Sequence, residues 1–241
     1  MKKSMLAAVV GLAVGIGFTN DSNAEERAWA WSPLGVGIAA PAQLPFMSSD
    51  VYGIRIGGLF GYNHDVYGLD VGVVEYTSGD FAGLQASGFS WTDGSVCGLQ
   101  AAGVANVVCG NALALQVAPV NLTWGEAAGL QVSAVNYAQA FAGVQFGALL
   151  NWNNSLSYGF QAGVVNADQD EFVGFALGAV NYANSFTGFQ CGVFNTAYEA
   201  TGLQLGVINA CDRMHGVQVG LFNLILESPK LPIMVIANAS F

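Results

Sequence analysis

Residues 202–209 read Gly-Leu-Gln-Leu-Gly-Val-Ile-Asn, and residues 188–195 read Gly-Phe-Gln-Cys-Gly-Val-Phe-Asn. This phrase, with its glutamine between two glycines and its closing asparagine, returns about every fifteen residues from Gly53 to Asn223. Repetition at a short, fixed period indicates that one small structural unit is stacked many times. The architecture of the chain therefore follows from this unit.

Each unit can be numbered from its first glycine, so that glutamine stands at position +2 and asparagine at position +7. Twelve units follow one another with spacings of 14 to 16 residues. Their zero positions are Gly53, Gly68, Gly83, Gly98, Ala114, Gly129, Gly143, Gly159, Gly174, Gly188, Gly202 and Gly216.

The unit has the length and the alternation of a β-strand. Side chains alternate between two faces along a strand, and positions +1, +3 and +5 are almost uniformly apolar, as in Leu203, Leu205 and Val207. The even positions are symmetric about the glutamine, which suits strands that run in either direction. From −3 to +7 the strand has the roughly 9 to 11 residues that cross a bilayer as a tilted β-strand. We predict an all-β fold, an antiparallel up-and-down transmembrane β-barrel flattened across its glutamines.

Strands expected over residues 32–40 and 231–241 bring the total to about fourteen, an even number as in closed bacterial barrels. The turns collect the charged residues. Tyr and Trp gather near the strand ends, as Tyr76 and Trp91 do at +8, which is typical of a girdle at the membrane interface. The alternative is a β-solenoid with about fifteen residues per coil, in which Gln and Asn form stacked ladders.

The N-terminal residues predict export. Lys2 and Lys3 precede an apolar run from Met5 to Phe18 and small residues before a cleavage position after Ala24, which is the pattern of a secretory signal peptide. We therefore expect residues 1–24 to be a signal peptide and residues 25–241 to be a single β-barrel domain, located in the bacterial outer membrane.

Charge excludes one class of partner. Removing residues 1–24 leaves four basic and fifteen acidic residues, a net charge of −11, so the surface repels nucleic acid. Only 9% of the chain is charged, against roughly 25% in ordinary soluble domains. Beyond the signal peptide, no stretch of about 18 apolar residues predicts a transmembrane helix.

No residue pattern indicates catalysis, a cofactor or a metal. The two histidines, His64 and His215, accompany no nucleophile motif, and no Cys or His pair has ligand spacing. The acidic group at 168–171 is interpreted as a solvated turn. The four cysteines are expected to be unpaired thiols. We predict a protein that is not an enzyme and that has no cofactor.

The candidate site is a polar belt at position +2, on the face opposite the apolar one. Arg55 and Asp70 hold this position in neighbouring units, and we predict an ion pair between them. Glutamine fills the position in nine of the other ten units, and its amides can bond one another, which restricts passage to small solutes at most. The belt comprises Arg55, Asp70, Gln85, Gln100, Gln116, Gln131, Gln145, Gln161, Gln190, Gln204 and Gln218.

Two resemblances bear on function. The last strand alternates from Leu231 through Ile233 and Val235 to Phe241, and so resembles the terminal strand of bacterial outer-membrane β-barrels. The resemblance implies that Phe241 is an assembly signal for the barrel-assembly machinery. The phrase at 202–209 is similar to the bacterial "surface repeat-containing protein" families, which carry no catalytic motif.

Together these observations predict a non-enzymatic integral outer-membrane protein, structural or surface-exposed. Its expected partners are outer-membrane lipid, lipopolysaccharide and the barrel-assembly machinery. The alternative function is that of a soluble exported β-solenoid adhesin or scaffold.

Overall fold

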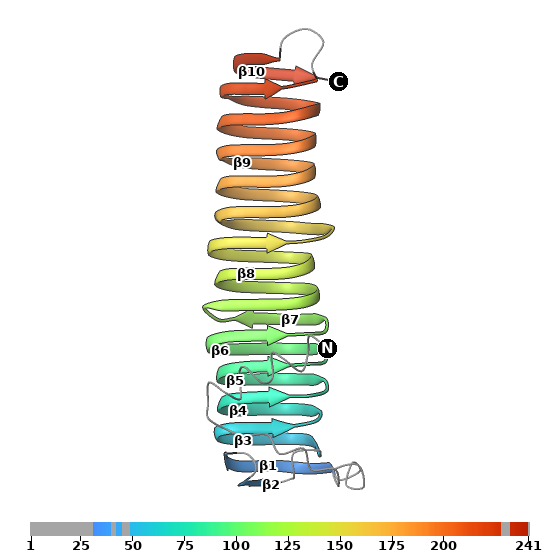
Figure 1. Cartoon of the computed structure of the whole chain (residues 1–241), viewed down its shortest axis with the longest axis vertical. Coiled ribbons are helices and arrows are strands. Elements are labelled where there is room, and N and C mark those ends of the chain that lie inside the picture. The colour runs from blue at the N-terminus through green and yellow to red at the C-terminus, as the bar shows by residue number, and fades with distance from the viewer. Residues whose placement is uncertain (1–30, 40–41, 45–48, 228–231, 241) are drawn as a thin grey trace, which may run out of the picture.

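The chain winds into a β-solenoid, a tall stack of coils made of extended backbone (Figure 1). The computed structural model describes residues 31–39, 42–44, 49–227 and 232–240. Successive repeat units pair in parallel and in register, so that Gly68 lies between Gly53 and Gly83. The prediction of an antiparallel barrel is therefore wrong, and the solenoid alternative with about fifteen residues per coil is correct.

The elements follow one another along the stack in chain order. They are β1 (Trp31–Ala39), β2 (Ala42–Leu44), β3 (Asp50–Asn63), β4 (Val66–Thr77), β5 (Phe81–Thr92), β6 (Val96–Val108), β7 (Ala112–Val117), β8 (Val120–Asn153), β9 (Ser157–Ile225) and β10 (Ile233–Ser240). The elements β8 and β9 exceed one repeat because the backbone stays extended through their turns. No helix in these ranges is long and apolar enough to span a membrane.

The glycine at position zero is required by the backbone. In β6, Gly98 has a φ of +129°, in the region that side chains with a Cβ rarely adopt. A Cβ on Gly98 would also clash with the carbonyl oxygen of Gly83 in the preceding coil. The same positive φ occurs at eleven of the twelve zero positions, all of them glycine, and Ala114 is the exception.

Each coil has two extended segments, one on each side of a corner between positions +2 and +7, and it buries side chains from both. Positions −2 and +2 point inward from the first segment, and +7 and +9 point inward from the second, as Asn195 and Ala197 do. At −2 stand apolar residues such as Phe172 and Phe186, whose rings stack with centroids 6.2 Å apart. The interior thus holds an apolar column beside polar columns. The side chains at +1 and +3 point outward.

Antiparallel strands terminate both ends of the stack. The short β2 pairs antiparallel with β1, and β10 pairs antiparallel with the end of β9 (Figure 1). The first and last strands expected from the sequence correspond to β1 and β10. Capping strands of this kind interrupt the parallel edge on which a further coil could stack.

Candidate functional site

The predicted polar belt is a buried column inside the solenoid rather than the lining of a lumen. The Nε2 atom of Gln100 donates to Oε1 of Gln85 at 2.9 Å, and the pattern repeats from coil to coil up to Gln145. Since both partners are fully buried, each bond satisfies a donor and an acceptor that burial would otherwise leave unpaired. We call this column the glutamine ladder.

The ladder breaks once and then resumes. Gln161 donates to Asp168 of its own coil at 3.0 Å, and Ala176 occupies the next +2 position. Gln204 restarts the ladder by donating to Gln190 at 2.8 Å. Burial raises the pKa of Asp168 to about 7, although hydrogen bonds from Asn153 and Gln161 act to lower it. The break therefore holds a buried carboxyl that titrates near neutrality.

A second ladder, which the sequence analysis did not assign to the interior, runs through position +7, or +8 in the units of Gly98 and Gly143. The Nδ2 atom of each asparagine donates to Oδ1 of the next, at 2.8 to 3.1 Å. It also donates to a backbone carbonyl of the next coil, as Asn195 does to Leu205 at 2.8 Å. The asparagine ladder comprises Asn106, Asn121, Asn136, Asn151, Asn166, Asn181, Asn195, Asn209 and Asn223. The recurrence of Asn at +7 was the signal that could have revealed it.

Unpaired oxygens mark the ladder ends. Within the described residues, Oδ1 of Asn106 has no hydrogen-bond partner, because Ser90 stands where the preceding asparagine would donate. Oε1 of Gln161 and Oε1 of Gln218 are likewise unpartnered among these residues, and neither is followed by a glutamine in the next coil. Each of these oxygens is thus unpaired because the neighbouring member of its ladder is missing.

The N-terminal end of the glutamine ladder is a buried charge cluster. Arg55 donates from Nε and Nη2 to the two oxygens of Asp70, at 2.7 and 2.6 Å, which confirms the predicted ion pair. Glu75, which the analysis of position +2 missed, has Oε2 3.0 Å from Nη2 of Arg55, without hydrogen-bond geometry. Burial raises the pKa of Glu75 to about 8 against the opposing effect of Arg55. One cation thus faces two carboxyl groups, of which Glu75 holds its proton more tightly than an ordinary glutamate does.

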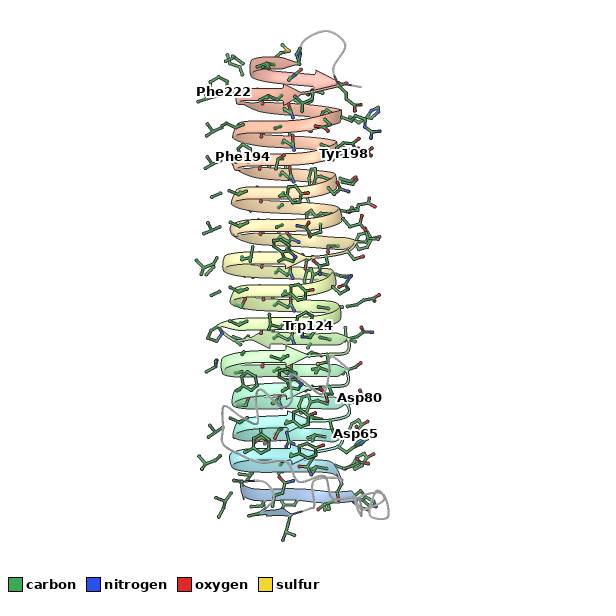
Figure 2. All side chains as sticks on the ribbon, viewed as in Figure 1. Asp65, Asp80, Trp124, Phe194, Tyr198 and Phe222 are labelled. Carbon is green, nitrogen blue, oxygen red and sulfur yellow. The ribbon has the colours of Figure 1, made fainter. Side chains whose placement is uncertain are left out.

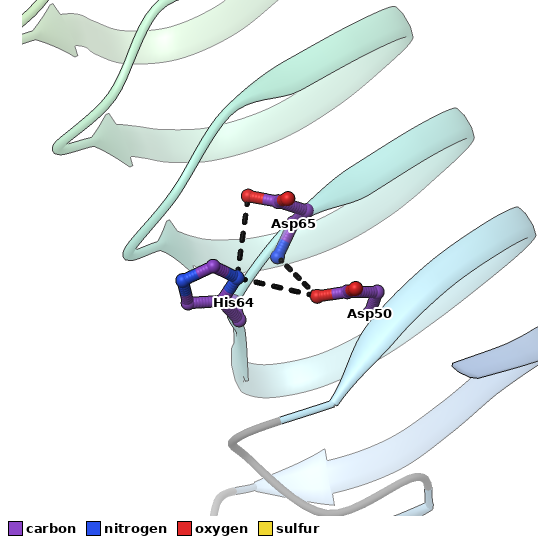
Figure 3. A group of neighbouring side chains, drawn as sticks. All are labelled: Asp50, His64 and Asp65. Atoms are coloured by element: carbon purple, nitrogen blue, oxygen red, sulfur yellow. Dashed lines mark hydrogen bonds and ion pairs between the residues drawn. The ribbon is translucent and has the colours of Figure 1, made fainter. Parts of the chain in front are cut away.

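Acidic residues form one edge of the first coils (Figure 3). Oδ1 of Asp50 accepts from the backbone N–H of Asp65 at 3.3 Å, and Oδ1 of Asp65 accepts from the N–H of Asp80 at 2.8 Å. Nδ1 of His64 lies 3.2 Å from Asp50 and 3.3 Å from Asp65. These three side chains offer ligand atoms within 4.8 Å of one another, the one grouping of this kind among the described residues. Their established bonds are to turn backbone, so the acidic row caps turns.

The outward side of the first segment is apolar throughout. We call it the leucine face and define it by positions +1 and +3 of the twelve units. Its members are Ile54, Leu69, Leu84, Leu99, Leu115, Leu130, Val144, Phe160, Phe175, Phe189, Leu203 and Val217 at +1, and Ile56, Val71, Ala86, Ala101, Val117, Val132, Phe146, Ala162, Leu177, Cys191, Leu205 and Val219 at +3. Leu84 is 54% exposed and Phe175 is 57% exposed. These are the residues that the barrel prediction directed toward lipid.

The outward side of the second segment is different, because the polar atoms of its aromatic side chains make hydrogen bonds. Both Tyr76 and Trp91 donate to the carboxylate of Asp93, at 2.5 and 2.8 Å. Trp152 donates to Asn154 at 2.8 Å. The aromatic residues near +8 that were interpreted as part of a membrane girdle, such as Tyr76 and Trp91, therefore lie on the outward side of the second segment.

The two edges of the solenoid also differ in chemistry (Figure 2). Phe194 and Phe222 project from one edge, and Asp65, Asp80 and Tyr198 project from the other. Phe241, the predicted assembly signal, lies outside the described residues, so that hypothesis stays a prediction.

No protein-family model, curated protein or solved structure matches the chain. The similarity of the repeat phrase to surface-repeat families therefore also stays a prediction, and function must be argued from the geometry.

Proposed function

We propose that this chain is an exported, non-enzymatic β-solenoid scaffold that attaches to a partner through its leucine face. The observation that carries the proposal is the distribution of polarity. Amides and charges such as Gln100 and Arg55 are buried, whereas large apolar side chains of the leucine face such as Leu84 and Phe175 are exposed. A contiguous apolar surface of this kind marks an interaction site.

The size of the leucine face supports a structural role. Twelve coils spaced by about 4.8 Å give a length of about 55 Å, and the span from position +1 to the apolar border at +5 gives a width of about 13 Å. The product, about 700 Å², exceeds the roughly 300 to 600 Å² of the largest apolar patch on a typical monomer. An extended flat surface fits attachment along the whole stack better than the capture of a small molecule.

The ladders support a scaffold for a second reason. Hydrogen bonds between side-chain amides tie coils to their neighbours, and identical residues stack along most of the axis. Such a solenoid is stabilised by nearest-neighbour contacts and grows into a rod without needing a globular core. The signal-peptide pattern of residues 1–24 supports export.

Adsorption to an apolar matrix tests the proposal. The exported chain should bind phenyl-substituted resin, and Leu69→Thr, Leu84→Thr and Leu99→Thr together should abolish most of this binding, because they remove exposed apolar area while keeping a strand-forming residue. The matched control replaces Val135, Val165 and Val180, on the outward side of the second segment, by Thr. Equal loss in both triple variants, or a chain that stays in the cytoplasm, would overturn the proposal.

A further inference from the structure

We infer that the leucine face is a self-association surface, on which two copies of the chain pack face to face with their solenoid axes parallel. This inference rests on the proposed function and names the partner of the same surface. It is carried by three features of the described residues: the area of the face, the regularity of its rows and the placement of charge around it.

The area suits a stable dimer. About 700 Å² per copy approaches the roughly 800 Å² that each partner buries in a standard specific interface. All 24 positions of the face are Ala, Val, Ile, Leu, Phe or Cys, so no charge loses its hydration when the face is covered. Obligate homodimer interfaces have this apolar character.

The rows of the face fit a second copy of itself. Parallel, in-register pairing places Leu84 beside Leu69 and Leu99, so that equivalent side chains form straight ridges along the axis. A second copy has the same ridges, with the same spacing of about 4.8 Å between side chains along each ridge, and two such sheets can interdigitate about 10 Å apart. An unrelated protein surface would lack this matching period.

Charge selects the relative direction of the two copies. One border of the face carries the acidic edge, with Asp65 and Asp80, and the other carries apolar residues at +5 such as Val193 and Val207. A two-fold axis parallel to the solenoids places each acidic edge beside the apolar border of the partner. A two-fold axis across them would bring both acidic edges together, which like-charge repulsion disfavours. The parallel arrangement is therefore the one the charges permit.

Charge also argues against a lipid surface as the occupant. Proteins that lie on membranes combine an apolar face with Lys and Arg that attract anionic lipid. This chain has six Lys and Arg against sixteen Asp and Glu. Among the described residues, the acidic group of Asp50 and Asp65 lies on the edge that borders the face.

Cross-linking of a single introduced cysteine tests the arrangement. In the chain with its four cysteines replaced by Ala, Leu84→Cys is treated with a bismaleimide of about 10 Å reach. In the parallel dimer the two introduced thiols lie in coils that face each other, and a covalent dimer is expected. In an antiparallel dimer residue 84 faces the coil of Phe189, seven coils away, so the two thiols are about 34 Å apart. A cross-link obtained only when Leu84→Cys is mixed with Phe189→Cys would overturn the parallel arrangement.

Sedimentation equilibrium tests the surface. The chain with Leu84, Leu99 and Leu115 replaced by Thr should dissociate at least a hundredfold more readily than the wild type, because both copies lose buried apolar area. The control with Val135, Val165 and Val180 replaced by Thr should remain dimeric, and circular dichroism checks that both variants keep their β structure. A control variant that dissociates equally overturns the inference.

The proposed function and this inference fail differently. A wild-type chain that is monomeric at all concentrations, yet binds phenyl resin through the leucine face, overturns the dimer and leaves the scaffold proposal standing. If the wild-type chain floats with vesicles of anionic phospholipid and the variant with Leu84, Leu99 and Leu115 replaced by Thr does not, lipid is the occupant of the face in place of a second copy.

Discussion

The glycine at position zero offers the sharpest test of the parallel stack. Gly98→Ala introduces a Cβ where φ is +129° and where the carbonyl oxygen of Gly83 already occupies the space. Strain of this backbone region costs about 1 to 3 kcal/mol, and the overlap adds a similar overpacking cost. We expect Gly98→Ala to lower the free energy of unfolding by about 3 kcal/mol.

The matched control lies in the same strand. At Gly103 an added Cβ would meet its nearest neighbour, a backbone atom of Gly88, at 3.8 Å, an ordinary contact. Gly103→Ala should therefore change stability by less than about 1 kcal/mol, with the sign favouring alanine because the unfolded chain loses freedom. Urea unfolding measures both variants, and hydrogen exchange shows whether the loss is confined to the coils around β6, as expected for a stack of nearest-neighbour contacts. Equal effects of the two substitutions would refute the reasoning.

The buried charges and the acidic edge give three more tests. The free energy of unfolding should fall as pH rises from about 4.5 to about 8, because Glu75 (pKa about 8) and Asp168 (pKa about 7) keep protons in the folded chain that the unfolded chain has released. Urea titrations at several pH values should show a flatter profile for the double variant Glu75→Gln with Asp168→Asn. A wild-type free energy of unfolding that rises over this pH range contradicts the prediction. Arg55→Met leaves the buried Asp70 without its cation and should cost about 3 to 5 kcal/mol. The pair Arg55→Gln with Asp70→Gln extends the glutamine ladder and should recover most of this loss in the same assay. Asp65→Ala removes a turn acceptor and should cost about 1 kcal/mol, and Asp65→Asn, which keeps Oδ1, should cost less; identical urea midpoints would exclude the capping role.

Alternation along the repeat was enough to predict strands, a period of fifteen residues and the pairing of Arg55 with Asp70. It could not predict the direction of pairing. The unit is symmetric about its glutamine, so its face pattern is the same in a strand that runs up or down. An exposed apolar row also looks the same in sequence whether lipid or another protein covers it.

The asparagine ladder was missed for a geometric reason. Positions +2 and +7 differ in parity, so a straight strand would place Gln204 and Asn209 on opposite faces. In the structure both are fully buried, because the coil turns a corner between them. A corner that changes parity leaves little trace in a pattern of apolar residues, and Glu75 at +7 of its unit was overlooked for the same reason.

The two ladders run in opposite senses, and this bears on how long such a stack can be. Gln100 donates to the preceding coil, whereas Asn121 donates to the following one. The amide dipoles of one ladder therefore oppose those of the other, and added coils do not accumulate a net dipole from these side chains along the axis. Each further coil also leaves the number of unpaired ladder ends unchanged, because it satisfies one end and creates another. Neither electrostatics nor hydrogen bonding sets a length, so the antiparallel strands β2 and β10 are what ends the rod.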